Sequence, residues 1–212
     1  MYNHPCLQIT LRPHVIRWGV NKHHLQFLIK EGVPCINTMF VEKGQAPSLI
    51  NVMQKWPKIV LKPIVGLNSY QMTVIRDQEN MQAKQEAFQA MLNDSLDGAM
   101  IQPFMPGAQT ELSLIYLGGH YSHAIRLVPG DERRSDRHFV RCQPEADAMA
   151  VADCVIKACP WEQPLMSARV DLVEDFEEGG YKLMELEMID PYLYLDEDNA
   201  SALVDVIEKA IK

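Results

Sequence analysis

Two strand-like stretches in the last quarter of the chain constrain its fold most, because both carry charges among aliphatic residues. The first has Arg169 and Asp171 two positions apart, and the second has Glu185 and Glu187 in the same relation. Alternate residues of a β-strand share a face, and the acidic, glycine-containing run 175–180 between the stretches is suited to a hairpin turn. The four side chains are therefore expected to converge on one face of an antiparallel pair.

Three carboxylates on an otherwise apolar sheet repel one another unless a divalent metal lies between them. Oxygen ligands on rigid strands suit Mg²⁺, which takes one or two protein carboxylates and completes its coordination with phosphate oxygens and water, and Mn²⁺ is a second candidate. Asp171, Glu185 and Glu187 are the candidate metal ligands. Arg169 is placed to pair with a phosphate or a substrate carboxylate. The alternative is a solvated acidic strand face without a metal.

Composition excludes several classes of protein. The 212 residues carry a formal net charge of -8, which argues against nucleic-acid binding, because neutralising phosphates requires a basic surface. No apolar run is as long as a membrane span. Five cysteines without a CxxC pair fit reduced thiols better than a disulfide framework or a zinc site. We therefore expect a cytoplasmic protein with no membrane partner.

Helices and hairpins are interspersed along the sequence, which predicts an α+β fold rather than a doubly wound parallel sheet. Helices are expected over 22–32, 48–56, 78–96, 145–157 and the last residues from about 199, and strands over 34–41, 58–63, 71–75, 99–105, 111–117, 121–127, 167–173 and 183–189. The apolar face of the third helix comprises Phe88, Met91, Leu92 and Leu96. The arginine-rich stretch 129–137 has no apolar periodicity and is expected to be a loop. A proline interrupts the strand 99–105, which favours a lobe boundary there, between 1–103 and 104–212.

Lys62 ends an apolar strand and is followed by Pro63 and a polar turn that begins at Gly66. Backbone N–H groups of such a turn can hold phosphate oxygens while a lysine supplies charge. This pattern predicts a phosphate contact beneath a flap. The alternative is a surface lysine at a strand end.

Six segments, in this order, resemble the ATP-grasp superfamily, in the branch that includes D-alanine–D-alanine ligase, glutathione synthetase and the cyclo-ligase of cycloserine biosynthesis. They are 17–22 (RWGVNK), 58–63 (KIVLKP), 101–104 (IQPF), 111–114 (ELSL), 168–171 (ARVD) and 183–191 (LMELEMIDP). The resemblance implies two α+β lobes that clasp a nucleotide, like the ATP-binding domain of glutathione synthetase. Residues 1–103 would carry the phosphate flap, and 104–212 would carry the adenine, ribose and metal sites.

The resemblance also implies roles for single residues. Lys22 and Lys62 would contact the nucleotide phosphates, and Gly66 would belong to the flap over them. The hinge from Gln102 through Phe104 to Met105 would hold adenine, partly through backbone groups. By the same resemblance, Glu111 would bind the ribose hydroxyls, Asp171, Glu185 and Glu187 would bind magnesium, and Arg169 would be the catalytic arginine that stabilises the acyl-phosphate and tetrahedral species.

The implied reaction is ADP-forming: a small-molecule carboxylate attacks the γ-phosphate of ATP, and an amine or similar nucleophile opens the resulting acyl phosphate. Such chemistry needs metals and cations rather than a protein nucleophile. Arg126 and one of the arginines at 133, 134, 137 or 141 are further candidates for phosphate contacts, and the sequence does not distinguish them.

Two departures from the family leave alternatives open. The resemblance begins within the first twenty residues, whereas relatives have an amino-terminal domain before it. Either the chain is a truncated form, or a partner protein or a second copy in a homodimer supplies the missing wall. The flap also has fewer glycines than is usual, which limits the approach of backbone to phosphate. A nucleotide-binding protein with little catalysis is therefore a second hypothesis. A metal-dependent nuclease is the third and ranks last, because Glu187 stands where that scheme requires lysine.

Overall fold

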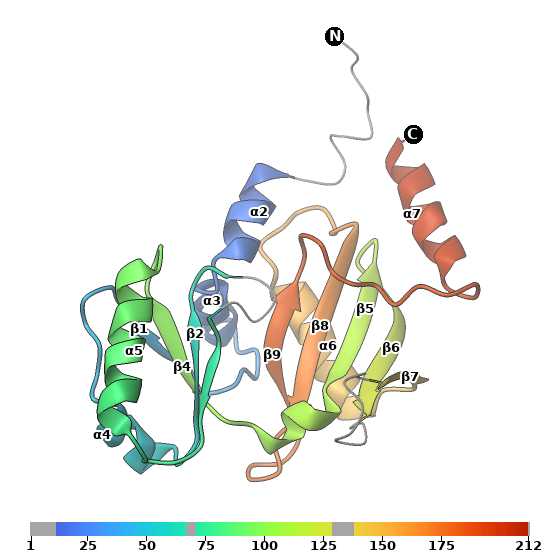
Figure 1. The fold of residues 1–212 in the computed structure, drawn as a ribbon. Helices are drawn as coiled ribbons and strands as arrows, with labels where there is room; N and C mark the ends of the chain where they lie inside the picture. The colour runs from blue at the N-terminus through green and yellow to red at the C-terminus, as the bar shows by residue number, and fades with distance from the viewer. Residues whose placement is uncertain (1–11, 67–70, 129–137, 212) are drawn as a thin grey trace. The chain divides into compact units, whose positions relative to one another are not determined.

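The computed structural model describes residues 12–66, 71–128 and 138–211, and the chain divides into two compact units (Figure 1). The larger unit comprises Met1–Gly19, Leu28–Pro34 and Met105–Lys212, and the smaller unit comprises Val20–Phe27 and Cys35–Phe104. The chain passes from the smaller to the larger unit between Phe104 and Met105, and it also crosses between them within α3 (His24–Lys30). The assignment of a nucleotide-binding lobe to each of 1–103 and 104–212 stays a prediction.

Four antiparallel strands form the sheet of the smaller unit, in the order β1-β4-β2-β3. The strands are β1 (Met39–Val41), β2 (Ile59–Pro63), β3 (Thr73–Ile75) and β4 (Ala99–Pro103). Helix α5 (Met81–Asp94) packs against β2, and α4 (Leu49–Lys55) packs against α5. Alternation along β2 buries Ile59 and Leu61 and leaves Lys62 half-buried.

The core of the smaller unit lies between this sheet and its two helices. Its fully buried members are aliphatic and aromatic, and each contributes about 1.5–3 kcal/mol by leaving water. The largest of them are Leu49, Ile59, Leu61, Ile75, Phe88, Leu92 and Ile101. The predicted helix face of Phe88, Met91 and Leu92 is therefore confirmed, but Leu96 is 83% exposed, because α5 ends at Asp94 before reaching it.

The predicted hairpin of residues 58–63 and 71–75 is confirmed, since β2 and β3 pair antiparallel with Ile59 opposite Ile75. The strand predicted over 34–41 is shorter, and only Met39–Val41 pairs with β4. Before it, the Thr38 hydroxyl donates to the Ile36 carbonyl at 2.8 Å, a local bond that competes with strand pairing. The predicted turn after Gly66 falls largely at 67–69, outside the described residues.

The larger unit contains a five-stranded antiparallel sheet with the order β7-β6-β5-β8-β9. The strands are β5 (Leu112–Leu117), β6 (His120–Val128), β7 (His138–Cys142), β8 (Ser167–Glu174) and β9 (Tyr181–Glu187). The two predicted hairpins, β5–β6 and β8–β9, are both confirmed. Gly118 and Gly119 close the first with φ angles of 57° and 80°, which favour glycine.

Helix α6 (Ala146–Ala158) covers one face of this sheet (Figure 1). Its buried side chains are Ala148, Ala152 and Val155, and Asp153 accepts a 2.8 Å hydrogen bond from the Tyr116 hydroxyl on β5. Because side chains alternate along β5, Ser113 lies on the opposite face. That second face carries the predicted charged residues.

Three elements of the larger unit complete it. Helix α2 (Pro13–Val20) and strand β7 are absent from the sequence-based prediction, whereas the final helix α7 (Ala200–Ile211) is confirmed. Strand β7 lacks apolar alternation and forms by pairing with β6, with Phe139 opposite Leu127. The loop predicted over 129–137 lies outside the described residues. Among the helices that the structure describes, none combines the length and apolar character needed to span a bilayer.

Gly98 precedes β4 with a φ of +87°, and a Cβ atom there would lie 2.3 Å from the Val41 carbonyl oxygen. Gly98→Ala is therefore expected to cost strain and a backbone clash together, roughly 3 kcal/mol or more of unfolding free energy. The matched control is Gly44→Ala, since Gly44 has a φ of +82° with no atom within 4 Å of the added Cβ. The control is expected to lose only about 1–2 kcal/mol. Equal losses in urea unfolding would contradict the close contact of Gly98 with Val41.

Candidate functional site

Strand pairing brings the predicted charged residues together on the face opposite α6. Arg169 lies opposite Glu187, and Asp171 lies opposite Glu185, so the four residues share one face of two adjacent strands, as the sequence predicts. The register then shifts, so that β9 has one extra residue, Met184, between Glu185 and its next paired position. This β-bulge returns the following residues to the face covered by α6.

Arg169 and Asp171 form a buried ion pair. Arg169 Nε donates to Asp171 Oδ1 at 2.8 Å and to Oδ2 at 3.0 Å, and Nη2 donates to Oδ2 at 2.8 Å. The Ser113 hydroxyl on β5 donates to Asp171 Oδ1 at 2.7 Å. The Asp171 side chain is 1% exposed and that of Arg169 is 17% exposed. The pair is therefore fixed in place by hydrogen bonds from two strands.

Burial dominates the electrostatics of this pair. Loss of water raises the pKa of Asp171, and repulsion from Glu185 adds to it, against the lowering effect of Arg169 and Ser113. For Arg169, burial lowers the pKa, but the hydrogen bonds and charge of Asp171 outweigh burial and raise the pKa overall. The charge of Glu187 adds a smaller increase. The site therefore holds three carboxylates against one guanidinium, an excess of negative charge that a cation would relieve.

The arrangement of the acids differs from a ready-made metal site. No group of three histidines, cysteines or acids among the described residues is placed to hold a metal ion. Asp171 directs both oxygens at Arg169 and Ser113, while Glu185 and Glu187 are only half-buried. The assignment of all three acids to a metal stays a prediction, and the contacts of Asp171 favour another role for that residue.

The segment around Leu193 and Tyr194, which the sequence analysis did not predict, crosses the same face of the sheet. His123 Nε2 donates to the Leu193 carbonyl at 2.8 Å, and the rings of Phe139 and Tyr194 lie 4.9 Å apart. Arg141 Nη1 binds Asp196 at 2.9 Å. Tyr194 has a φ of +49°, which is unusual for a residue with a side chain. No periodicity in the sequence signals this segment, because long-range contacts hold it.

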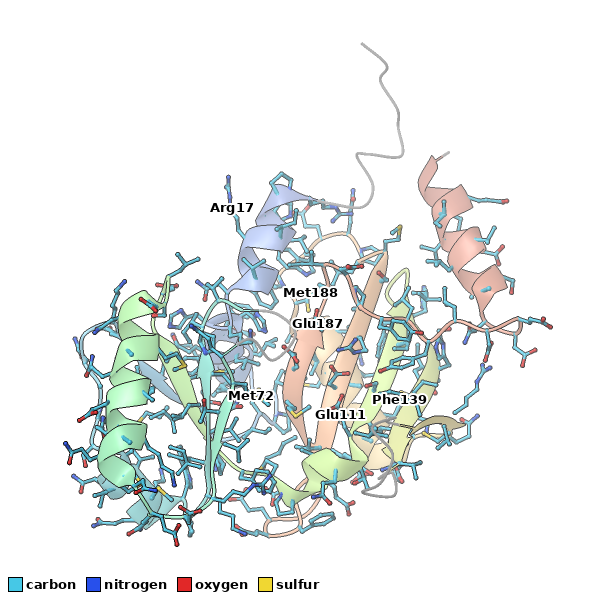
Figure 2. All side chains as sticks on the ribbon, viewed as in Figure 1. Arg17, Met72, Glu111, Phe139, Glu187 and Met188 are labelled. Carbon is cyan, nitrogen blue, oxygen red and sulfur yellow. The ribbon has the colours of Figure 1, made fainter. Side chains whose placement is uncertain are left out.

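Tyr194 lies beside the charged cluster. Burial raises the pKa of its hydroxyl, and the charges of Asp171 and Glu111 raise it further, while Arg169 opposes them. The ring also contacts Tyr192 edge-to-face at 4.7 Å between centroids. An aromatic wall therefore borders the acidic site on the side of β7, where Figure 2 labels Phe139.

The structure separates two arginines that the sequence could not rank. Arg141 pairs with Ile125 on the site face, whereas Arg126 pairs with Val140 on the face covered by α6. There Arg126 Nη2 binds the Glu145 carboxylate at 2.8 and 2.7 Å and the Tyr181 hydroxyl at 3.3 Å. Arg126 is thus committed to packing α6. The candidates at 133, 134 and 137 lie outside the described residues.

In the smaller unit, Lys22 is brought to the end of β2. Its ammonium donates to the Gly66 carbonyl at 2.5 Å, and its backbone N–H donates to the Ile64 carbonyl at 3.0 Å. Asn21 forms a β-bridge with Val65 next to these bonds. Two residues predicted to serve the phosphates, Lys22 and Gly66, therefore meet. Lys62 lies on β2, two residues before Ile64, whose carbonyl accepts the Lys22 N–H.

The predicted adenine segment is held in place by hydrogen bonds of Gln102, near the end of β4, and of Phe104, just after it. Gln102 is 2% exposed and donates through Nε2 to the Thr38 hydroxyl at 2.9 Å. The Phe104 N–H donates to the Lys58 carbonyl at 2.8 Å, and the Arg76 guanidinium lies 4.5 Å from the Phe104 ring centroid. Met105 starts the larger unit before the 3-10 helix η1 (Pro106–Thr110). The Gln102 amide is therefore used in a hydrogen bond to Thr38, so that a ligand at this segment would bind to backbone groups.

Glu111, the predicted ribose acid, stands between η1 and β5 (Figure 2). Its carbonyl accepts from the Leu127 N–H at 2.8 Å, and its Oε1 lies 3.5 Å from the Ser113 hydroxyl. Glu111 thus adjoins the residue that binds Asp171. The roles in nucleotide binding predicted for these residues of both units remain predictions.

Solved structures similar to this one are ATP-grasp ligases. D-cycloserine synthetase DcsG shares 24% identity over 94% of this chain and 72% of its own, with a TM-score of 0.80. The ligase PsnB, solved with a minimal precursor, shares 13% over 94% of this chain and 62% of its own, at TM-score 0.69. D-alanine–D-alanine ligase from Bacillus anthracis, complexed with ATP, shares 16% identity over 91% of this chain and 66% of its own, with a TM-score of 0.67.

These likenesses show that the chain has the ATP-grasp fold, so the predicted α+β class and fold are confirmed. The chain spans less than two thirds of the length of PsnB and of the Bacillus anthracis ligase. Neither a protein-family profile nor a curated protein sequence matches it.

The turn that joins β8 to β9, and so sets their register, is built on Asp175. Its Oδ1 accepts from the N–H groups of Glu177 and Glu178 at 3.0 and 3.1 Å, and its Oδ2 pairs with Lys182 at 2.7 Å. Burial raises the pKa of Asp175, but Lys182 and the two N–H groups outweigh it, so the pKa lies below its ordinary value. The ionised carboxylate therefore stabilises the hairpin.

Asp175→Asn is expected to lower the unfolding free energy by about 1–3 kcal/mol at pH 7, because Lys182 loses a buried partner. A lowered pKa contributes stability that is complete above the unfolded value of about 4 and is lost as pH falls through the folded value. Urea unfolding at pH 7 and pH 3 should thus show the difference between variant and wild type shrinking at low pH. Asp77→Asn, at an exposed pair with Lys84, is the control and should change stability less. A pH-independent loss at Asp175 would contradict this account.

Proposed function

We propose that the protein is an ATP- and Mg²⁺-dependent carboxylate ligase that forms ADP and joins a carboxylate to an amine or similar nucleophile. The observation that carries the proposal is the cluster of Arg169, Asp171, Glu185 and Glu187 on one face of a sheet with the ATP-grasp fold. The similar structures are named as ligases, and one is complexed with ATP. The reaction proceeds through an acyl phosphate on the substrate.

Magnesium fits the chemistry of the two carboxylates on β9. Glu185 and Glu187 are half-buried neighbours with excess negative charge around them, and two carboxylates are what Mg²⁺ takes from a protein when phosphates complete its coordination. When bound, the ion neutralises charge on the transferring phosphoryl group. Magnesium is also named, with ADP, in a structure of PsnB. Manganese, which accepts the same ligands, stays a prediction.

The chain's own cations supply the rest of the electrostatic stabilisation. Arg169 is the proposed catalytic residue, because its guanidinium is fixed beside the acids and stabilises negative charge on the acyl phosphate and the tetrahedral species that follows. Lys22 and Lys62 are proposed to meet the phosphates, with Gly66 in the flap. Phosphoryl transfer requires little more from a protein than such positioning and charge.

The nucleoside end of ATP is assigned to the remaining predicted residues. Backbone groups from Gln102 to Met105 are proposed to bind adenine, since the Gln102 amide is already used by Thr38. Phe104 or Met105 supplies apolar contact, and Glu111 binds the ribose hydroxyls. The substrates are proposed to be a small-molecule carboxylate and an amine. The homodimer, the partner protein and the cytoplasmic location stay predictions.

The test measures thermal stabilisation by Mg²⁺ and ATP, together with ADP release across a panel of amino acids and small carboxylates. A ligand that binds only the folded state raises its stability by mass action. Lys62→Ala and Glu185→Gln are each expected to lower turnover by roughly 10²-fold or more, by analogy with the loss of one transition-state contact. Both should change unfolding free energy far less than turnover.

The matched controls are Lys58→Ala and Glu177→Gln, exposed residues of the same two hairpins, which should keep wild-type turnover. Absence of stabilisation at millimolar ATP would overturn the nucleotide proposal. Stabilisation without substrate-stimulated ADP release would favour the second hypothesis, a nucleotide-binding protein with little catalysis. No observation favours the nuclease.

A further inference from the structure

We infer that three side chains next to Lys22 form a positioning cluster, and that the affinity for nucleotide phosphates depends on this cluster through Lys22. The members are Asn21, His23 and Asp97, and all of them belong to the smaller unit. The inference rests on the proposed function, in which Lys22 meets the phosphates. It gives a part to three side chains to which the sequence analysis assigned no role in the site.

Asn21 is the centre of the positioning cluster. Its Nδ2 donates to Asp97 Oδ2 at 2.5 Å, and its Oδ1 accepts from the His23 backbone N–H at 2.9 Å. The ring nitrogen Nδ1 of His23 lies 3.0 Å from Asn21 Oδ1 and 3.4 Å from Asp97 Oδ2. Because both of these oxygens are acceptors, Nδ1 carries the proton in the neutral ring as well as in the charged one. The Asn21 amide is therefore used at both of its ends.

The two outer members are themselves fixed by other parts of the smaller unit. Asp97 stands in the turn in which the buried Ser95 hydroxyl accepts from the Gly98 N–H at 3.1 Å. The His23 ring stacks on the Phe40 ring of β1, with 5.4 Å between centroids. Asp97 is 51% exposed, so its charge contributes little to stability and its contact with the cluster matters for geometry. The cluster thus joins the residues before α3 to β1 and to the turn before β4.

The backbone of Lys22 is held between this cluster and the end of β2. Asn21 forms a β-bridge with Val65, and the Lys22 N–H donates to the Ile64 carbonyl at 3.0 Å. The Ile64 N–H in turn donates at 3.1 Å to the carbonyl of Gly98, in the turn that carries the acid of the cluster. The backbone at Lys22 therefore cannot shift without breaking hydrogen bonds to two neighbouring segments.

Lys22 needs such support because its side chain is long and flexible. Ordering a lysine side chain costs rotamer entropy, so its ammonium is placed accurately only when the backbone that carries it is fixed. The ammonium has three N–H donors and gives one to the Gly66 carbonyl, so it can also bind phosphate oxygens at the same turn. Supporting hydrogen bonds of this kind set the precision of a binding site. Loss of the cluster would displace the ammonium without removing it.

The experiment is a double-mutant cycle between Asn21→Ala and Lys22→Ala, with the dissociation constant of ATP at saturating Mg²⁺ measured by calorimetric titration. Asn21→Ala alone is expected to weaken ATP binding roughly 5- to 10-fold, because a charge-assisted hydrogen bond to phosphate is lost or lengthened. In the Lys22→Ala background the same substitution should change the dissociation constant by less than about 2-fold, because no ammonium is left to position. Asn93→Ala, at an exposed hydrogen bond on α5, is the asparagine control and should bind ATP as wild type does.

Two further measurements separate positioning from a merely structural role. Urea unfolding should show that Asn21→Ala lowers stability by similar amounts in both backgrounds, although its effect on ATP binding requires Lys22. The exchange variant that combines Asn21→Asp with Asp97→Asn reverses donor and acceptor at equal net charge. It should restore ATP binding to within about 3-fold of wild type, because the hydrogen bond is formed again.

The outcomes distinguish this inference from the proposed function. Equal losses of ATP affinity from Asn21→Ala in the two backgrounds would overturn the inference, and so would wild-type affinity of the single variant. If Asn21→Ala does not fold, Asp97→Ala takes its place in the same cycle. Wild-type affinity of Lys22→Ala would also overturn the inference, while substrate-stimulated ADP release would still support a ligase. Absence of any ATP binding by wild type would instead overturn the proposed function.

Discussion

The buried ion pair of Arg169 and Asp171 is the interaction on which the candidate site depends. Charges leave water without a large penalty only when partners and hydrogen bonds replace it. Asp171 receives its partner from its own strand and a further hydrogen bond from Ser113 on β5. The register of β5 against β8 is thereby tied to this contact, because a one-residue slip would move every side chain to the other face.

The two faces of the larger unit's sheet have different roles. One packs against α6 and uses Arg126 to bind Glu145 at the start of that helix. The other holds the acids and is crossed by the segment at Leu193 and Tyr194, whose positive φ is maintained by contacts with His123 and Phe139. Backbone strain of this kind persists only where surrounding contacts enforce it. One face of the sheet thus forms the core with α6, and the opposite face carries the candidate site.

Local signals account for the elements that the sequence predicted. Glycine turns and alternating apolar residues predicted the hairpins of both units, and the ordered segments predicted the ATP-grasp fold. Elements without such signals were missed: α2 is a short helix at the start of the described chain, and β7 forms through pairing with β6. Leu96 was misplaced because apolar periodicity continues past the point where α5 ends at Asp94.

For the site itself, the sequence alone determined that Arg169 and Asp171 share one face of their strand and that Glu185 and Glu187 share one face of theirs, because side chains alternate along a strand. The sequence did not determine that the two pairs face the same side, which depends on a register set by the β-bulge at Met184. It could not determine which of them bind each other. That was decided by the tertiary structure, which places β8 between β5 and β9 and so removes Asp171 from water while β9 stays at the edge. Burial obliges the central carboxylate to pair with the guanidinium, whereas the carboxylates of β9 are only half-buried at the edge of the sheet.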